Sequence, residues 1–113
     1  MYDKTQLLKG TLEGCILKIL QRETTYSYEI VVRLNEYGFT EVREGTIYPL
    51  MLRLEKKKLI FSEFCPSPFG PSRKYFTLTG EGEKLLEEFE EAWEETKTAV
   101  ERILTGRSDC GEE

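Results

Sequence analysis

Apolar side chains follow helical spacing over the first half of the chain. Between residues 5 and 22 they recur every three or four positions, which predicts a first amphipathic helix. Ser27 is expected to cap a second helix that ends near Tyr37. Thr46 is expected to cap a third helix that ends near Lys58. The pattern therefore indicates three helices joined by short connections.

Two segments with strand character follow the third helix. Residues 59–65 and 73–79 alternate in polarity and are rich in aromatic side chains, which predicts two strands. The sequence PSPFGPS between them contains three prolines and a glycine, so it is expected to end the ladder and turn. A β-hairpin is therefore predicted.

The last third of the chain is apolar along two rows. Thr79 is expected to begin a long helix that continues to about residue 105. The first row has heptad spacing and contains Leu85, Phe89, Ala92, Thr96, Ala99 and Ile103. The second row contains Leu86, Trp93 and Val100. Both rows need a cover, so we expect a homodimer. Its predicted interface contains Leu85, Phe89, Ala92, Trp93, Thr96, Val100 and Ile103.

The domain organisation follows from the order of these elements. Residues 1–78 are expected to form a winged helix-turn-helix, residues 79–105 a dimerisation helix and residues 106–113 a flexible tail. The predicted fold class is mainly α with a small β-hairpin. The alternative is a last helix that packs only on its own domain. It is less favoured because residues 1–78 already make a compact unit.

Composition argues against several classes of protein. The 113-residue chain has no apolar run of about 18 residues, so no membrane span is expected. Its first residues lack the features of a secretion signal, and its three cysteines are odd in number and far apart, so a cytoplasmic protein is expected. It contains no histidine and no closely paired cysteines, which argues against an enzyme, a metal site or a cofactor.

Charge is divided unequally along the chain. The net charge is −5, yet residues 1–78 carry 12 Lys and Arg against 9 Asp and Glu. Residues 79–113 carry 4 Lys and Arg against 12 Asp and Glu. The chain therefore has a mildly basic front and a strongly acidic back, which would keep the last helix away from phosphates.

The densest basic cluster lies on the third helix, whose first turn is expected to hold Pro49. If Ile47, Leu50 and Leu54 face the core, the polar and basic side chains face outward and fit a DNA major groove. The alternative is that the lysines only form a solvent-exposed last turn of the helix, where positive charge favours the helix dipole. The predicted DNA-binding residues are Thr46, Tyr48, Arg53, Lys56 and Lys57 on this helix, with Arg73 and Lys74 at the base of the hairpin.

Several motifs resemble the PadR family of transcriptional regulators. They are EGTIYPLMLRLEKKKLI and GPSRKYFTLTGEGEKLL, with YSYEIVVRL upstream, and the resemblance covers roughly residues 7–95. It implies a cytoplasmic repressor that binds a pseudo-palindromic operator in double-stranded DNA. Several positions depart from the family pattern. Tyr26 and Ser27 stand where the family commonly has His-Gly, and Lys58 stands where it commonly has glycine.

The sequence LEEFEEAW resembles a stretch of multidrug-sensing PadR members, in which a tryptophan lines an apolar cavity at the dimer centre. This implies a planar aromatic ligand stacked on Trp93, with walls from Leu8, Leu12, Cys15 and Phe89. It is equally open that Trp93 only packs in the interface. The alternative function is a winged-helix module for protein–protein interaction that does not bind specific DNA.

Overall fold

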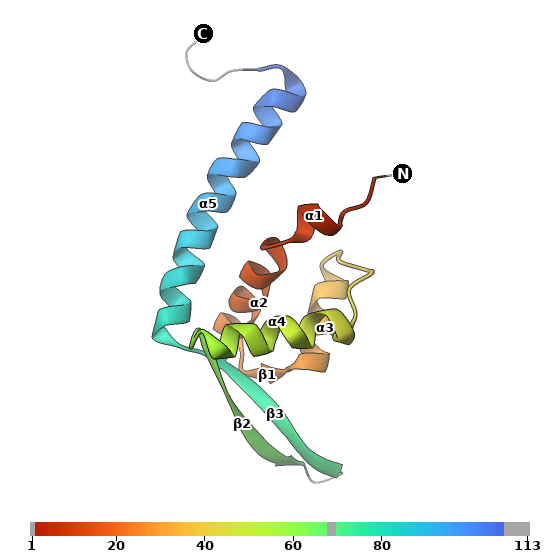
Figure 1. The fold of residues 1–113 in the computed structure, drawn as a ribbon, viewed down its shortest axis with the longest axis vertical. Helices are drawn as coiled ribbons and strands as arrows, with labels where there is room; N and C mark the ends of the chain where they lie inside the picture. The colour runs from red at the N-terminus through yellow and green to blue at the C-terminus, as the bar shows by residue number, and fades with distance from the viewer. Residues whose placement is uncertain (1, 68–69, 108–113) are drawn as a thin grey trace.

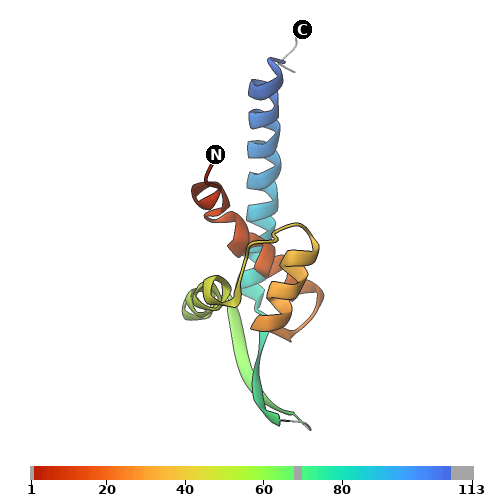
Figure 2. The same ribbon diagram turned by 90° about the vertical axis from the view of Figure 1, so that its right-hand side faces the viewer.

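The computed structural model describes residues 2–67 and 70–107. Its helices are α1 (Thr5–Leu8), α2 (Thr11–Arg22), α3 (Ser27–Glu36), α4 (Glu44–Lys56) and α5 (Gly80–Thr105). Its strands are β1 (Thr25–Tyr26), β2 (Ile60–Ser67) and β3 (Gly70–Leu78). The hairpin and α5 leave the helical body at opposite ends (Figures 1 and 2). This confirms the predicted class, a winged helix-turn-helix followed by one long helix.

The sheet has a third strand that the sequence did not predict. The strand order is β1-β3-β2, and all neighbours are antiparallel. The two-residue β1 pairs Thr25 with Phe76 and Tyr26 with Tyr75. The hairpin is also longer than predicted, because the ladder reaches the pair Ser67 and Gly70. Proline in the PSPFGPS segment does not end the ladder, which instead takes an irregularity between Cys65 and Ser67.

The core lies where α2, α3 and α4 meet the base of the sheet. Ile47 and Leu54 of α4 are buried as predicted, and Leu50 is partly buried. Met51, which was not predicted, is fully buried beside them. The largest fully buried side chains are Phe76, Ile16, Leu17, Ile30, Leu34, Ile47, Met51, Leu54, Ile60 and Leu86.

One predicted helix is interrupted, and two predicted helix caps are wrong. The first helix is interrupted at Gly10, whose φ of +85° belongs to the left-handed region, so α1 and α2 are separate. Tyr26 occupies the N-cap of α3, and the hydroxyl of Ser27 instead donates to Glu44 Oε2 at 2.6 Å. Helix α4 begins at Glu44 with Arg43 as N-cap, which puts Thr46 inside the helix.

Pro49 therefore lies beyond the first turn of α4, contrary to prediction. Its nitrogen has no hydrogen to donate to the carbonyl of Gly45, one turn earlier. Helix α4 therefore lacks the backbone hydrogen bond that another residue at position 49 would donate to Gly45.

The C-terminus of α4 ends in a left-handed turn made by lysine. Lys58 has a φ of 64°, the one positive φ of a non-glycine residue in the described chain. Lys58 N–H donates to Glu55 O at 2.9 Å, and Leu59 N–H donates to Leu54 O at 3.0 Å. These two bonds form a Schellman motif, in which glycine is the usual left-handed residue. Lysine at position 58 therefore adopts a backbone conformation that glycine would adopt at lower cost.

Helix α5 is joined tightly to that turn. The Thr79 side chain caps α5 by accepting from Gly82 N–H at 3.0 Å, which confirms the predicted helix start. The same hydroxyl lies 2.8 Å from Lys58 O and 2.9 Å from Leu59 O. A Cβ added to Gly82 would lie 2.1 Å from Leu59 O, so only glycine fits this contact.

The first turns of α5 pack on the helical body. Leu86 is 0% exposed and belongs to the core, so the expectation that its row needs a partner is wrong at this position. Phe89 is partly buried, and its ring covers Gly14 of α2, where an added Cβ would lie 2.4–2.5 Å from three ring atoms. The C-terminal part of the helix projects away from the body (Figure 1).

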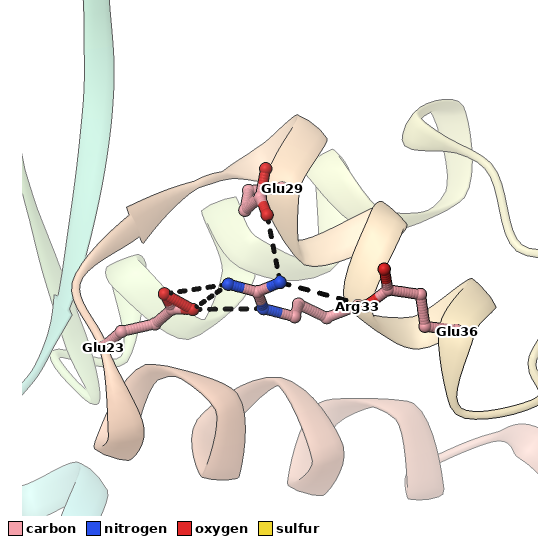
Figure 3. Close-up of polar contacts among 4 residues, drawn as sticks. All are labelled: Glu23, Glu29, Arg33 and Glu36. Atoms are coloured by element: carbon pink, nitrogen blue, oxygen red, sulfur yellow. Dashed lines mark hydrogen bonds and ion pairs between the residues drawn. The ribbon is translucent and has the colours of Figure 1, made fainter.

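One arginine ties α3 to the segment that precedes β1. Arg33 of α3 donates to both carboxylate oxygens of Glu23, with the shortest contact at 2.6 Å (Figure 3). It also pairs with Glu29 at 3.2 Å and Glu36 at 3.9 Å. Its hydrogen bonds and charge attraction with Glu23 raise the pKa of the guanidinium above its ordinary value. This cluster fixes the turn between α2 and α3.

Candidate nucleic-acid interface

The predicted DNA-binding side chains of α4 are exposed. Tyr48 is 37% exposed, and all the others also reach solvent, namely Thr46, Arg53, Lys56 and Lys57. Leu52, which was not predicted, lies one turn after Tyr48 and is also exposed. Helix α4 therefore presents polar, basic and apolar groups on one accessible surface, the mixture that reads base edges and phosphates.

Arg53 has an intramolecular partner. Its guanidinium donates two hydrogen bonds to Glu13 Oε2 of α2, at 3.0 Å from Nε and 2.8 Å from Nη2. Both side chains lie near the surface, so this pair contributes about 1 kcal/mol or less to stability. A phosphate that approached Arg53 would compete with Glu13 for the same donors.

The β2–β3 hairpin is the wing of the fold, and its two predicted DNA-binding residues, Arg73 and Lys74, are also held in place. The Arg73 guanidinium lies 4.5 Å from the centre of the Tyr26 ring, a cation–π contact. Tyr26 in turn meets Tyr75 edge to face at 5.3 Å. Because β1 supplies Tyr26, the unpredicted strand also sets the position of Arg73.

Lys74 connects the wing to α4. Its ammonium lies 3.4 Å from Glu55 Oε1 of α4 and 5.5 Å from the centre of the Phe76 ring. Ser62 of β2 donates to the other oxygen of Glu55. Glu55 thus links α4 to both strands of the hairpin, and these contacts fix the angle between α4 and the hairpin.

An open pocket of 280 Å³ lies where α3, α4 and β3 converge. It brings together three predicted residues, Tyr48, Arg73 and Lys74. The other predicted residues of α4 do not line it. The remaining lining residues were missed by the sequence analysis and are Tyr26, Ser27, Tyr28 and Glu44. Ser27 was predicted as a helix cap, and both Tyr26 and Ser27 depart from the family pattern, but neither was predicted to line a site.

The residues predicted to bind an aromatic ligand are placed mostly against the body. Leu12 is buried, and Leu8, Cys15 and Phe89 pack against the core. Burial raises the pKa of the Cys15 thiol above its ordinary value. Trp93 remains 45% exposed. The ligand site and its residues stay a prediction.

Most of the predicted dimer residues lie on the projecting part of α5. Leu85, Trp93 and Val100 are between a third and a half exposed, and Ile103 is 79% exposed. Leu104 is equally exposed although neither predicted row includes it. Ala92 and Thr96 also reach solvent, whereas Phe89 packs on its own α2. The interface itself stays a prediction.

Residues 2–67 and 70–107 lack the features of a membrane span and of a metal site. No helix in this part of the chain is long and apolar enough to cross a membrane. The same residues contain no group of three or more acidic or cysteine side chains placed to hold a metal ion. Cys110 and the rest of the predicted tail beyond residue 107 lie outside the described residues.

Comparison with known proteins agrees with the fold. Residues 16–88 match the transcriptional regulator PadR-like family. A PadR-like transcriptional regulator from Bacillus cereus is 47% identical, with a TM-score of 0.80 over 96% of this chain and 100% of that one. A Streptococcus transcriptional regulator is also 47% identical, with a TM-score of 0.79 over 88% of this chain and 97% of the other.

A PadR-like transcription factor from Bacteroides fragilis is 43% identical, with a TM-score of 0.75 over 88% of this chain and 96% of that one. The family match spans more than half of the chain and includes α4 and the whole hairpin. The surface described above, with its exposed basic helix and wing, therefore lies within the matched region, and the chain belongs to the PadR-like family of transcriptional regulators.

Proposed function

We propose that this protein is a homodimeric repressor that binds a pseudo-palindromic operator in the cytoplasm. The observation that carries the proposal is the separation of two surfaces. Exposed cations gather on α4 and the wing. Large exposed apolar side chains, up to 79% exposed, continue along the projecting part of α5 at the other end of the molecule. One end is suited to DNA and the other to a second copy of the chain.

The proposed dimer pairs the projecting parts of two α5 helices. Ile103 and Leu104 are each 79% exposed, and Trp93 and Val100 are nearly half exposed. Covering such side chains contributes roughly 25 cal/mol for each Å² of apolar surface removed from water. The glutamates of α5 remain on the outside of the pair. Two recognition helices would then enter major grooves about 34 Å apart, one turn of DNA.

Oligomeric state is the first test. We expect the parent to elute from gel filtration as a dimer and a Val100→Glu/Ile103→Glu variant to elute as a monomer. Each substitution places a carboxylate at the proposed apolar contact. Glu101→Gln is the matched control on the same helix and should remain dimeric. A parent that is monomeric at all concentrations would contradict the proposal.

DNA binding is the second test. We expect the protein to bind the region upstream of its own gene with an affinity that falls as salt rises. Arg53→Glu/Lys57→Glu should abolish this binding. The milder Arg53→Gln/Lys57→Gln should lower the salt slope by roughly four for a dimer, since each lost phosphate contact removes about 0.9.

Lys84→Gln/Lys97→Gln is the control for this test, because it removes equal charge from α5. If the Arg53 and Lys57 variants bind as tightly as the parent, the proposed DNA surface is wrong. Absence of any specific binding by the parent would instead favour a protein–protein interaction module.

We also propose that a planar aromatic compound induces release by stacking on Trp93. The support is the exposure of this ring on α5, next to the turn that carries Phe89. Trp93 is the single tryptophan of the chain, so its fluorescence reports the site directly. Quenching should be saturable and accompanied by loss of DNA binding. A Trp93→Ala variant that remains dimeric and is still released by the same compound would contradict the ligand proposal.

A further inference from the structure

Glu44 is an unusual residue for a surface that meets DNA. It is an exposed carboxylate on the first turn of α4 and the one acidic residue that lines the 280 Å³ pocket. Arg73 and Lys74 line the same pocket. A carboxylate near DNA phosphates lowers affinity by charge repulsion, so its presence calls for a compensating contact.

The position of Glu44 suits contact with base edges. N-terminal residues of a recognition helix are the ones that reach base edges in the major groove. Tyr48 follows Glu44 by four residues, so both side chains lie on the same face of α4, and both line the pocket. By contrast, Lys56 and Lys57 lie at the far end of the helix.

A side-chain hydrogen bond holds one of the two carboxylate oxygens of Glu44. The hydroxyl of Ser27 donates to Oε2 at 2.6 Å, a short charge-assisted hydrogen bond. Ser27 is itself nearly buried, so its hydroxyl holds a fixed position. Among the described residues no donor is bonded to Oε1. The second oxygen is therefore available as an acceptor in a defined direction.

From this geometry we infer that Glu44 reads a cytosine in each operator half-site, accepting a hydrogen bond from the N4 amine, and that Ser27 is a positioning residue for it. The inference rests on the proposed operator binding. On its major-groove edge cytosine presents one polar group, the N4 donor, which suits a carboxylate oxygen. Adenine places the N7 acceptor beside its amine, and guanine presents only acceptors there. The repulsion between Glu44 and phosphate is offset only when this base is present, so Glu44 adds selectivity at the expense of general affinity.

Selection from a randomised duplex pool tests the inference. The parent should enrich a cytosine at one fixed position of each half-site. Glu44→Ala should reduce discrimination at that position by roughly 5- to 150-fold, the range of one good base contact. Glu44→Gln should change the preferred base to adenine, which pairs with a carboxamide. Ser27→Ala should give a smaller loss of discrimination at the same position.

Binding to random-sequence duplex separates base reading from a structural role. Loss of the carboxylate should leave this binding unchanged or make it tighter, because a repulsive charge is removed. If Glu44 only supported the fold, both kinds of binding would weaken together. Glu81→Gln is the matched control, since Glu81 is also an acid in the first turn of a helix, on α5.

Two failures are distinguishable. A parent that enriches no sequence overturns the proposed function and this inference with it. A parent that enriches an operator, together with a Glu44→Ala variant that enriches the same operator with the same base preferences, overturns the role of Glu44 alone.

Discussion

Replacing Lys58 by glycine should stabilise the protein. Lys58 holds a φ of 64° at the end of α4, a left-handed conformation that costs an L-residue about 1–2 kcal/mol. Glycine adopts it without this cost but loses roughly 0.5–1 kcal/mol through its greater freedom in the unfolded chain. We therefore expect Lys58→Gly to raise the free energy of unfolding by about 0.5–1 kcal/mol.

The hydrogen bonds of the turn do not depend on the side chain. Lys58 N–H and Leu59 N–H donate to α4 carbonyls, and the Lys58 carbonyl accepts from Thr79. These donors and this acceptor belong to the backbone at positions 58 and 59, so all of them remain in the glycine variant. The expected gain should thus appear without loss of a contact, as an increase of roughly 2–5 °C in Tm for a chain of this size.

Thermal unfolding followed by far-ultraviolet circular dichroism measures this effect, at one fixed protein concentration because a dimer unfolds in a concentration-dependent way. Lys58→Ala controls for the loss of charge, since alanine keeps the conformational cost. Lys57→Gly controls for glycine itself, because Lys57 has a helical φ of −82°. A Lys58→Gly variant no more stable than Lys58→Ala would refute the reasoning.

Three neighbouring residues of α2 carry the remaining predictions. Glu13→Gln should free Arg53 and tighten DNA binding by roughly two- to fivefold, the worth of an exposed ion pair; unchanged binding would mean that Glu13 does not compete. Gly14→Ala should lower the free energy of unfolding by roughly 1–3 kcal/mol in urea titrations, because its Cβ would overlap the Phe89 ring; an unaltered midpoint would contradict this. Burial raises the pKa of Cys15 from 9.0, so above that pH the unfolded chain ionises first and stability falls. Cys15→Ala should flatten this alkaline decline, and an equal slope in both proteins would argue against it.

The sequence predicted the parts of the fold that local periodicity and turn chemistry control. The buried positions Ile47 and Leu54 follow from helical spacing, and the start of α5 follows from the cap at Thr79. Local sequence patterns did not predict two features of the fold, the break at Gly10 and the strand β1. Apolar spacing continues through Gly10, although the backbone there leaves the helix. The strand β1 has two residues and exists only because β3 offers a free edge, so no periodicity could reveal it.

The candidate DNA-binding residues remain a prediction, and the side chains that hold them in place were not predicted. Exposure and charge identify Arg53, Arg73 and Lys74 as candidates for DNA contact, since both are properties of single residues. Their partners come from elements distant in sequence, such as Glu13 for Arg53 and Tyr26 for Arg73. Glu44 was not predicted because its negative charge argues against contact with DNA. Its orientation depends on Ser27, which lies on another helix.

The junction between α4 and α5 limits how a signal can pass through the molecule. Thr79 bonds the turn at Lys58 and caps α5 at the same time, and Gly82 leaves no space between α5 and the carbonyl of Leu59. Leu86 and Phe89 then fasten the next turns of α5 to the body. The winged helix-turn-helix body and the first turns of α5 consequently move as one rigid unit. In a dimer built on α5, the distance between the two α4 helices would change only when the subunits rotate about their contact. Because that contact lies far from α4, a small rotation there would displace each α4 helix by a large distance at the DNA.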